Sequence, residues 1–320
     1  MSVTITRPAP SSLPAPLGDD LAAARNFAQA EKADATRRAY RSDFRLFAEY
    51  CRAHGAEPVP ASPEMVAAFL SGEALRGTKA ATIGRRLAAI RYAHAAAGLE
   101  PPTNSEALKA VMRGIRRTLG VARTQKAPAT ADRVRRMLDA CPDTLRGKRD
   151  RALLALGFAG AFRRSELVAL TVADVTEVPD GFRVVIRRSK TDQEGAGQEI
   201  VVPRGASLRP VEAVQTLLAA AGITAGPIFR PINKAGRVVD AALTAESAAG
   251  VVKQRAEAVG LDPAEFAGHS LRAGFLTSAA EAGATVHKMM EVSRHKSAAN
   301  LQVYVRRVDM FRDHAGAKFL

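Results

Sequence analysis

The sequence predicts a mainly α protein with a small β-sheet, divided into an N-terminal helical bundle and a C-terminal mixed α/β domain. Three observations support this fold class. Apolar residues recur at helical spacing over most of the 320 residues, two short segments have strand composition, and a stretch near residue 125 has no apolar period. A chain of this length suffices for two domains, each with its own core.

The composition indicates a polyanionic partner. Lys and Arg total 47 against 32 for Asp and Glu, which gives a net charge of +15 and a pI near 10.5. An acidic membrane surface would also attract this charge, but the sequence contains no apolar run of 18 residues and no signal peptide. We therefore expect nucleic acid. Cys51 and Cys141 form no disulfide framework, which predicts a cytoplasmic location, and the scattered histidines predict no metal site.

Residues 1–17 are rich in proline and lack periodicity, which predicts a disordered tail. Residues 18–120 have the pattern of four or five helices. The first, 34–52, carries an apolar stripe at helical spacing. Later helices are expected to begin at Ser62–Pro63, at Thr78 and at a Thr103 or Asn104 cap.

The outer faces of these helices are rich in arginine and carry few balancing carboxylates. A charged outer face is ordinary for a soluble helix, so solvation alone is the alternative interpretation. We expect a grip on the DNA backbone. The candidate contacts in the bundle are Arg37, Arg38, Arg41, Arg45, Thr82, Arg85, Arg86, Arg116 and Arg117.

A basic linker is predicted at residues 121–130, which have no apolar period and end in proline and small residues. In a clamp around a duplex this linker would cross the phosphates, so Arg123 and Lys126 are further candidate contacts. The second domain, 131–320, is expected to begin at the Thr130 cap.

The second domain is expected to combine helices with a β-hairpin. The predicted helices cover 134–141, 148–159, 211–221 and 244–258, and the predicted strands cover 181–188 and 198–203. Lys190 lies in the turn between the strands. Arg188, Thr244 and Ser247 are candidate DNA contacts. Arg163 follows the buried helix 148–159 and Glu166 lies one turn on, so Arg163 is either in an ion pair with Glu166 or directed at an anion.

The stretch from His269 to Tyr304 contains the candidate catalytic side chains, which are two histidines, an arginine and a tyrosine. His269 and Arg272 lie three residues apart, on one side of a helix expected to begin at Ser270. Two short helices are expected at 284–292 and 297–307, with His295 between them and Tyr304 on the second. Singly, each of these residues has a structural interpretation as a solvated or core side chain. Together they suit a phosphodiester attacked by tyrosine, because a phenol with a pKa of about 10 needs cations on the phosphate.

The order and rough spacing of these residues resemble those of the tyrosine recombinases, the phage integrase family, and especially its Cre-like members. The matching segments are R-R-S-E-L at Arg163, the hairpin with Lys190, H-S-L-R at 269–272, His295, Tyr304, and T-I-G-R-R-L and A-V-M-R-G-I-R-R in the bundle. The resemblance implies a SAM-like core-binding bundle and a tyrosine-recombinase catalytic domain.

The resemblance also implies a role for each matched residue. Arg163 is preferred to Arg164 because it lies three residues before the glutamate, as the family pattern R-x-x-E requires. The implied roles are phosphate clamp for Arg163 and Arg272, orienting partner for Glu166, general acid for Lys190, proton-transfer aid for His269, phosphate donor for His295 and nucleophile for Tyr304.

The implied function is a site-specific DNA recombinase that works through a 3′-phosphotyrosyl link and a Holliday junction. It would act as a homotetramer on two duplexes that carry inverted-repeat sites, and it would need no metal, ATP or cofactor. In free solution, without DNA, it would be a monomer. Residues Val308–Leu320 would dock on a neighbouring protomer or pack on their own chain. Glu246 stands near a base-reading arginine of Cre-like members, so the target site should differ. A type IB topoisomerase and a non-catalytic DNA-binding protein remain alternatives, and the source would be bacterial, phage or plasmid DNA.

Overall fold

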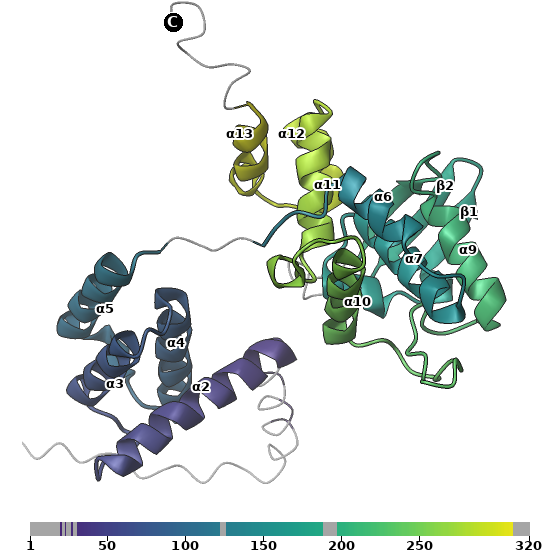
Figure 1. Cartoon of the computed structure of the whole chain (residues 1–320). Helices are drawn as coiled ribbons and strands as arrows, with labels where there is room; N and C mark the ends of the chain where they lie inside the picture. The colour runs from purple at the N-terminus through teal and green to yellow at the C-terminus, as the bar shows by residue number, and fades with distance from the viewer. Residues whose placement is uncertain are drawn as a thin grey trace, which may run out of the picture. The chain divides into compact units, whose positions relative to one another are not determined.

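The computed structural model describes residues 31–121, 126–187 and 197–309 together with Asp20, Ala23 and Phe27, and the side chains of 306–309 are not part of this description. The chain divides into two compact units, Met1–Arg123 and Thr124–Leu320 (Figure 1). Both are mainly helical, and the second contains a three-stranded sheet, so the predicted fold class is confirmed. The predicted tail, residues 1–17, lies outside the described residues.

The first unit is a helical bundle around an apolar core. Its described elements are α2 (Asp34–Ala53), α3 (Pro63–Leu75), α4 (Ala80–Ala96), a 3-10 turn (Pro102–Asn104) and α5 (Glu106–Leu119). Phe47 and Cys51 of the predicted stripe are fully buried, and Phe47 packs edge-on against Phe69 of α3. The hydroxyl of Ser62 accepts a hydrogen bond from the Met65 N–H at 3.2 Å, which is the cap expected there.

The start of α5 differs from the prediction. The helix begins at Glu106 and not at a Thr103 or Asn104 cap. Both of those side chains are occupied elsewhere, since Arg91 of α4 donates to Thr103 Oγ1 at 3.1 Å and to Asn104 Oδ1 at 2.8 Å. The arginine thereby ties the 3-10 turn to α4, and the helix starts after the turn.

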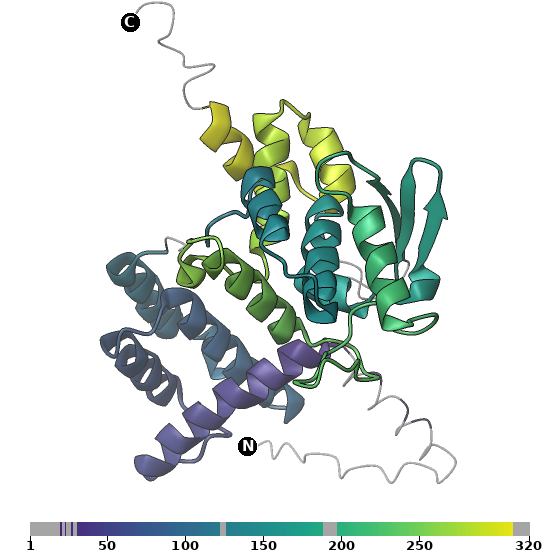
Figure 2. The same cartoon turned by 45° about the vertical axis from the view of Figure 1, so that its right-hand side comes forward.

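The second unit is built around the buried helix α7, which lies beside α9 in both Figure 1 and Figure 2. Every residue of α7 from 152 to 158 is buried, as its apolar composition predicts. The helices of this unit are α6 (Ala131–Asp139), α7 (Leu145–Ala159), α8 (Arg164–Ala169), α9 (Pro210–Ala221), α10 (Ala245–Glu257), α11 (Ser270–Glu281), α12 (Val286–Ser293) and α13 (Gln302–Asp309).

Several helix boundaries in this unit correct the sequence predictions. Helix α7 begins at Leu145, three residues before the predicted start at 148, because Thr144 caps it, and α12 begins at Val286 and not at 284, because Thr285 caps it. Helix α6 ends at Asp139, so Cys141 lies beyond the helix and is only half-buried. Helix α13 begins at Gln302 because Ala298–Asn300 forms a 3-10 turn first. Tyr304 is therefore in the first turn of α13.

The sheet contains β1 (Val175–Val178), β2 (Gly181–Ile186) and β3 (Gln198–Pro203), all antiparallel and in that order. Phe182, Val184 and Ile186 alternate with exposed residues along β2, and this buried face packs under the helices. The prediction gave β2 and β3 but missed β1. The residues that join β2 to β3, from 188 to 196, lie outside the described part of the chain.

The segment that enters the second unit packs tightly against α11. The Ala129 N–H donates to the Ser270 carbonyl at 2.9 Å. A Cβ atom at position 274 would lie 1.7 Å from the Ala129 carbonyl oxygen, so a glycine is required there. This contact fixes the helix that carries Arg272. No helix in the described part of the chain is long and apolar enough to cross a membrane.

Candidate active site

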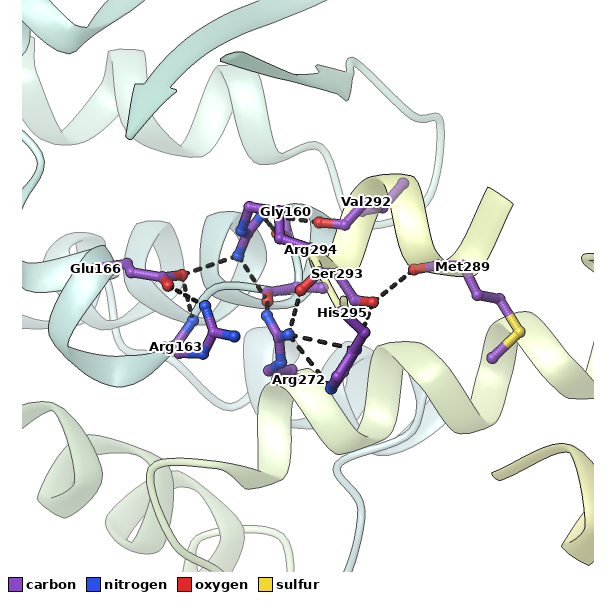
Figure 3. Close-up of polar contacts among 10 residues, drawn as sticks. Gly160, Arg163, Glu166, Arg272, Met289, Val292, Ser293, Arg294 and His295 are labelled. Carbon is purple, nitrogen blue, oxygen red and sulfur yellow. Dashed lines mark hydrogen bonds and ion pairs between the residues drawn. The ribbon is translucent and has the colours of Figure 1, made fainter. Parts of the chain in front are cut away.

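Arg163 is the N-cap residue of α8 and is paired with Glu166. Its Nη1 donates to Glu166 Oε1 at 2.6 Å, and its backbone N–H donates to Glu166 Oε2 at 2.9 Å (Figure 3). The second bond is the backward half of a capping box, which fixes the carboxylate at the start of the helix. Of the two possibilities that the sequence left open for Arg163, the ion pair with Glu166 is present.

Arg272 is fully buried in the first turn of α11. Its Nη1 donates to the Ala161 carbonyl at 2.7 Å, and its Nη2 donates to the Ser293 carbonyl and lies 3.4 Å from His295 Nδ1. The buried Nε of Arg272 has no hydrogen-bond partner among the described residues. The guanidinium is thus held in place by backbone carbonyls, while one donor has no protein acceptor.

His295 lies directly after the end of α12 and beside Arg272, as Figure 3 shows. Its Nδ1 is 2.7 Å from the hydroxyl of Ser293. That hydroxyl also donates to the Met289 carbonyl at 2.6 Å, so it can only accept from the histidine, and the Nδ1 must carry the proton. This arrangement leaves Nε2 of a neutral His295 as an acceptor.

Arg294 is a third arginine of the site, it is buried, and the sequence did not reveal it. Its Nη2 donates to Glu166 Oε2 at 2.9 Å and to the Ala161 carbonyl at 3.1 Å. Its Nη1 donates to the carbonyls of Gly160 at 3.0 Å and Val292 at 2.7 Å. The residue lies in a loop, where no periodicity indicates which side chains are buried. Only its place beside His295 could have suggested a role.

Burial and like charges shift the pKa values of these groups. Burial, together with Arg163 and Arg294, lowers the pKa of Arg272 to about 9, against the opposing effects of Glu166 and Tyr304. Burial and the neighbouring arginines lower the pKa of His295 to about 4, and His269 adds to this shift. Burial alone would raise the pKa of Glu166, but Arg294 and Arg163 bring it below its usual value. The site is strongly cationic and suits an anion.

His269 and Tyr304 belong to the same neighbourhood, because each influences the pKa of a site residue. His269 is the N-cap residue of α11 and is exposed, so α11 begins at Ser270 as predicted. Tyr304 is half-buried and packs against the apolar cluster of Leu276, Ala280, Met289 and Leu301. The structure thus brings Arg163, Glu166, Arg272, His295, His269 and Tyr304 into one region, while Lys190 lies outside the described residues.

Comparison with known proteins identifies the family. Residues 129–310 match the model of the phage integrase family, and residues 20–100 match that of its N-terminal SAM-like domain. The chain belongs to the phage integrase family. It is 39% identical over 290 residues to an integrase/recombinase XerD homolog of Selenomonas ruminantium, covering 89% of this chain and 85% of that protein. It is 26% identical over 289 residues to recombinase Cre of Escherichia phage P1, covering 83% and 82%.

Solved structures share the fold of this tyrosine recombinase. A λ integrase dimer bound to a COC′ core site has a TM-score of 0.61 at 17% identity, covering 92% of this chain and 82% of that one. A λ integrase tetramer bound to a Holliday junction has a TM-score of 0.58 at 17% identity, covering 89% and 76%. The predicted family and its Cre-like character are therefore confirmed.

The arginines that were expected to face outward from the bundle fall into two groups. Arg38, Arg41, Arg45, Arg116 and Arg117 are exposed. Arg86 is not turned away from the bundle, because it pairs with Glu73 and lies 3.8 Å from Asp43, with only 14% of its side chain exposed. Arg85 also pairs with Asp43, at 2.6 Å, but remains half-exposed. The expectation of few balancing carboxylates is therefore wrong for this pair.

The remaining candidate contacts have mixed surroundings. Arg37 pairs with Asp34 and Thr82 is half-buried. Lys126 is exposed and donates to the Ala264 carbonyl at 2.7 Å. Thr244 and Ser247 are exposed at the start of α10, where Thr244 Oγ1 accepts from the Ser247 N–H at 3.0 Å. Arg123 and Arg188 lie outside the described residues.

Proposed function

We propose that this tyrosine recombinase cuts and rejoins double-stranded DNA at specific sites through a 3′-phosphotyrosyl intermediate. The observation that carries the proposal is the gathering of three buried or half-buried arginines around one carboxylate, beside a histidine and a tyrosine. Among the described residues, Glu166 is the acid in hydrogen-bond contact with this cluster. The excess positive charge of these side chains supports a phosphate as the anion that the site binds.

The proposed reaction keeps the number of phosphodiester bonds constant. The Tyr304 oxygen attacks phosphorus while the bond to the 5′ oxygen breaks, and His269 helps to carry away the phenol proton. Lys190 gives a proton to the departing 5′ oxygen. Attack by a 5′-hydroxyl of the second duplex then reverses the step with exchanged strands, so neither ATP nor a metal is needed to restore the bond.

Each arginine has a distinct part in the proposed chemistry. Arg163 and Arg272 bind the non-bridging oxygens, where charge increases in the transition state. Neutral His295, whose Nε2 lies 3.5 Å from Arg272 Nη2, helps to orient Arg272, whereas the role of phosphate donor implied by the resemblance would require a protonated Nε2. Arg272 is wholly buried and has no carboxylate partner among the described residues, which is consistent with an anionic substrate oxygen as its partner. Glu166 orients Arg163 and offsets part of the positive charge before DNA binds.

The organisation of the chain follows from the same proposal. Residues 18–120 would be the core DNA-binding domain, 121–130 the linker and 131–320 the catalytic domain, in keeping with the two compact units. We propose a homotetramer on two inverted-repeat sites joined in a Holliday junction, formed from monomers, in the cytoplasm. The exposed arginines of the bundle, together with Lys126, Thr244 and Ser247, are the proposed DNA contacts. The proposed docking segment, Val308–Leu320, lies almost wholly beyond the described residues.

Covalent capture tests this function. The protein is incubated with a nicked suicide duplex made from the inverted repeats that flank its own gene, and SDS-resistant protein–DNA bands are measured. We expect a band that forms in excess EDTA and is lost in Tyr304→Phe. The matched control is Tyr92→Phe, which removes a hydroxyl from a ring that packs on Tyr40 in the bundle. This variant should form the band.

The other outcomes separate the alternatives. DNA binding that depends on salt but gives no band would overturn catalysis and favour the DNA-binding protein. A band on supercoiled plasmid without strand exchange between two sites would favour the topoisomerase. A band that survives Tyr304→Phe would assign the nucleophile to another residue.

A further inference from the structure

We propose that Arg294 is a positioning residue that holds Arg163, Arg272 and His295 in register around the scissile phosphate. This inference rests on the proposed function, because it assigns those three groups to the phosphate. Arg294 lies at the centre of the network in Figure 3, with Glu166 on one side and Arg272 on the other. Its side chain is 2% exposed.

One arm of the guanidinium acts on Arg163. Glu166 is shared, since its Oε1 accepts from Arg163 Nη1 and its Oε2 accepts from Arg294 Nη2. A carboxylate held from both sides has little freedom to rotate. The orientation of Arg163 therefore depends on a bond that Arg163 does not itself make.

The same arm acts on Arg272 through a shared backbone carbonyl. The Ala161 oxygen accepts from Arg272 Nη1 at 2.7 Å and from Arg294 Nη2 at 3.1 Å. Ala161 has a positive φ of 45°, a backbone conformation that is unfavourable for alanine and has to be maintained by its surroundings. Arg294 also donates to the preceding carbonyl, that of Gly160. The turn that holds Arg272 is thus fixed by Arg294.

The backbone of Arg294 sets the position of His295. Arg294 caps α12 in the left-handed region, with φ 58° and ψ 39°, where glycine is the usual residue. An arginine in this place loses conformational free energy relative to glycine, and its side chain supplies bonds that glycine lacks. His295 is the next residue along the chain. The hydrogen bonds that hold the Arg294 side chain therefore also hold the loop that carries the His295 imidazole.

The donor count indicates that Arg294 does not bind the phosphate itself. A guanidinium has four terminal N–H groups and one on Nε. The terminal groups of Arg294 serve Gly160, Val292, Ala161 and Glu166. Its Nε is buried and, like that of Arg272, has no hydrogen-bond partner among the described residues, so the count rests on the four terminal groups. By contrast, the described contacts of the Arg163 side chain engage only Nη1, which leaves donors for a substrate.

Lysine cannot reproduce this function. It has a single nitrogen with three donors, whereas four acceptors lie around the two terminal nitrogens of Arg294. Arg294→Gly removes the side chain and leaves a backbone suited to the left-handed conformation. Arg209→Gly is the matched control, because Arg209 is also left-handed, with φ 45°, but is exposed and, among the described residues, donates to the Ala206 carbonyl and to no residue of the network.

The experiment measures single-turnover formation of the SDS-resistant adduct on two forms of the same nicked suicide duplex. One carries the natural phosphodiester and the other a methylphosphonate, which lacks the negative charge that Arg163 and Arg272 are proposed to bind. Partners that orient metal ligands typically contribute about 10- to 100-fold to affinity or activity, and by analogy we expect Arg294→Gly to slow cleavage of the phosphodiester by that factor. The defect should be several-fold smaller on the methylphosphonate, and DNA affinity should hold.

Arg294→Lys should also be slowed more on the phosphodiester than on the methylphosphonate. This variant replaces Arg294→Gly in the test if the glycine variant does not fold. Arg209→Gly should behave as wild type on both duplexes. Equal slowing on both linkages would overturn the inference, since a general loss of structure does not depend on the charge of the substrate. Wild-type rates in both Arg294 variants would also overturn it. Failure of the wild-type protein to form any adduct would instead overturn the proposed function.

Discussion

Two regions of this recombinase hold arginines against buried carboxylates, and they deal with the surplus charge in different ways. In the bundle, Asp43 and Glu73 are paired with arginines of which two, Arg76 and Arg85, keep 58% and 52% of their side chains exposed. In the site, the side chains of Arg163 and Arg294, which share Glu166, are 16% and 2% exposed.

This difference in exposure indicates a different role for the arginines in the bundle and in the site. In the bundle, water solvates Arg76 and Arg85, while Arg86, which is only 14% exposed, lies between the two carboxylates. In the site Arg294 and Arg272 are both buried, and Arg272 has no carboxylate partner among the described residues. Charge of this kind is costly unless an anion arrives. The arginines of the bundle have carboxylate partners or water without DNA, whereas the buried charge of the site is neutralised when the DNA phosphate binds.

The largest test of this comparison removes the carboxylate from each region. Glu166→Gln leaves Arg294 buried with no ionic partner among the described contacts, and breaking such a pair costs about 3–5 kcal/mol. Asp43→Asn releases Arg85, whose side chain can turn to water. The free energy of unfolding should therefore fall by only about 1.5–3 kcal/mol, the value of a charged hydrogen bond. Urea unfolding of the full chain, followed by circular dichroism, measures both. Equal costs would show that exposure of the partner does not matter.

The next effect concerns Arg272 itself. Arg272→Lys keeps a charge but loses the fork that spans the Ala161 and Ser293 carbonyls. Loss of one preorganised donor typically costs about 10²–10³ in rate, and we expect that loss in adduct formation. Arg255→Lys is the matched control, because Arg255 is buried in the same unit but, among the described residues, its side chain pairs with Asp150 and not with a residue of the site. A similar loss in the control would mean that burial, and not contact with substrate, explains the effect.

A smaller effect should appear in the pH dependence of stability. Burial and nearby arginines lower the pKa of His295 to about 4, so the unfolded chain binds a proton more readily than the folded one between pH 4 and the usual histidine pKa of about 6.5. Stability from this source is present above about pH 6.5 and is lost as pH falls towards 4. Thermal unfolding at pH 7 and pH 5 should show a smaller loss in His295→Gln than in wild type. The exposed His287→Gln should match wild type, and identical losses in all three proteins would contradict the prediction.

The sequence predicted those parts of the site that depend on local spacing. The i,i+3 relation of Arg163 and Glu166 and the start of α11 at Ser270 both follow from the geometry of one helical turn. The missed strand β1 is short, and both of its central residues are exposed, so it carries no alternation that a sequence pattern can register.

The other differences arise where long side chains meet across the fold. Counting residues round α4 gives a direction for Arg86, but its guanidinium reaches Glu73 on α3. Arg294 is buried because its backbone is left-handed and its side chain turns towards Gly160, more than a hundred residues earlier. Contacts of this kind are set by tertiary packing, and no local period contains them.

The smallest effect should distinguish two arginines within the bundle. Arg117 is exposed on α5 and is a proposed phosphate contact, so Arg117→Gln should weaken DNA binding and lower the slope of log Kd against log salt by about 1. Arg86→Gln should instead lower the stability of the bundle and leave the slope unchanged, because the Arg86 guanidinium is in an ion pair with Glu73. Fluorescence anisotropy across a salt series, with thermal unfolding of each variant, measures both effects. A reduced slope for Arg86→Gln would mean that DNA competes with Glu73 for this arginine, and the ion pairs of the bundle would then also depend on DNA for their balance.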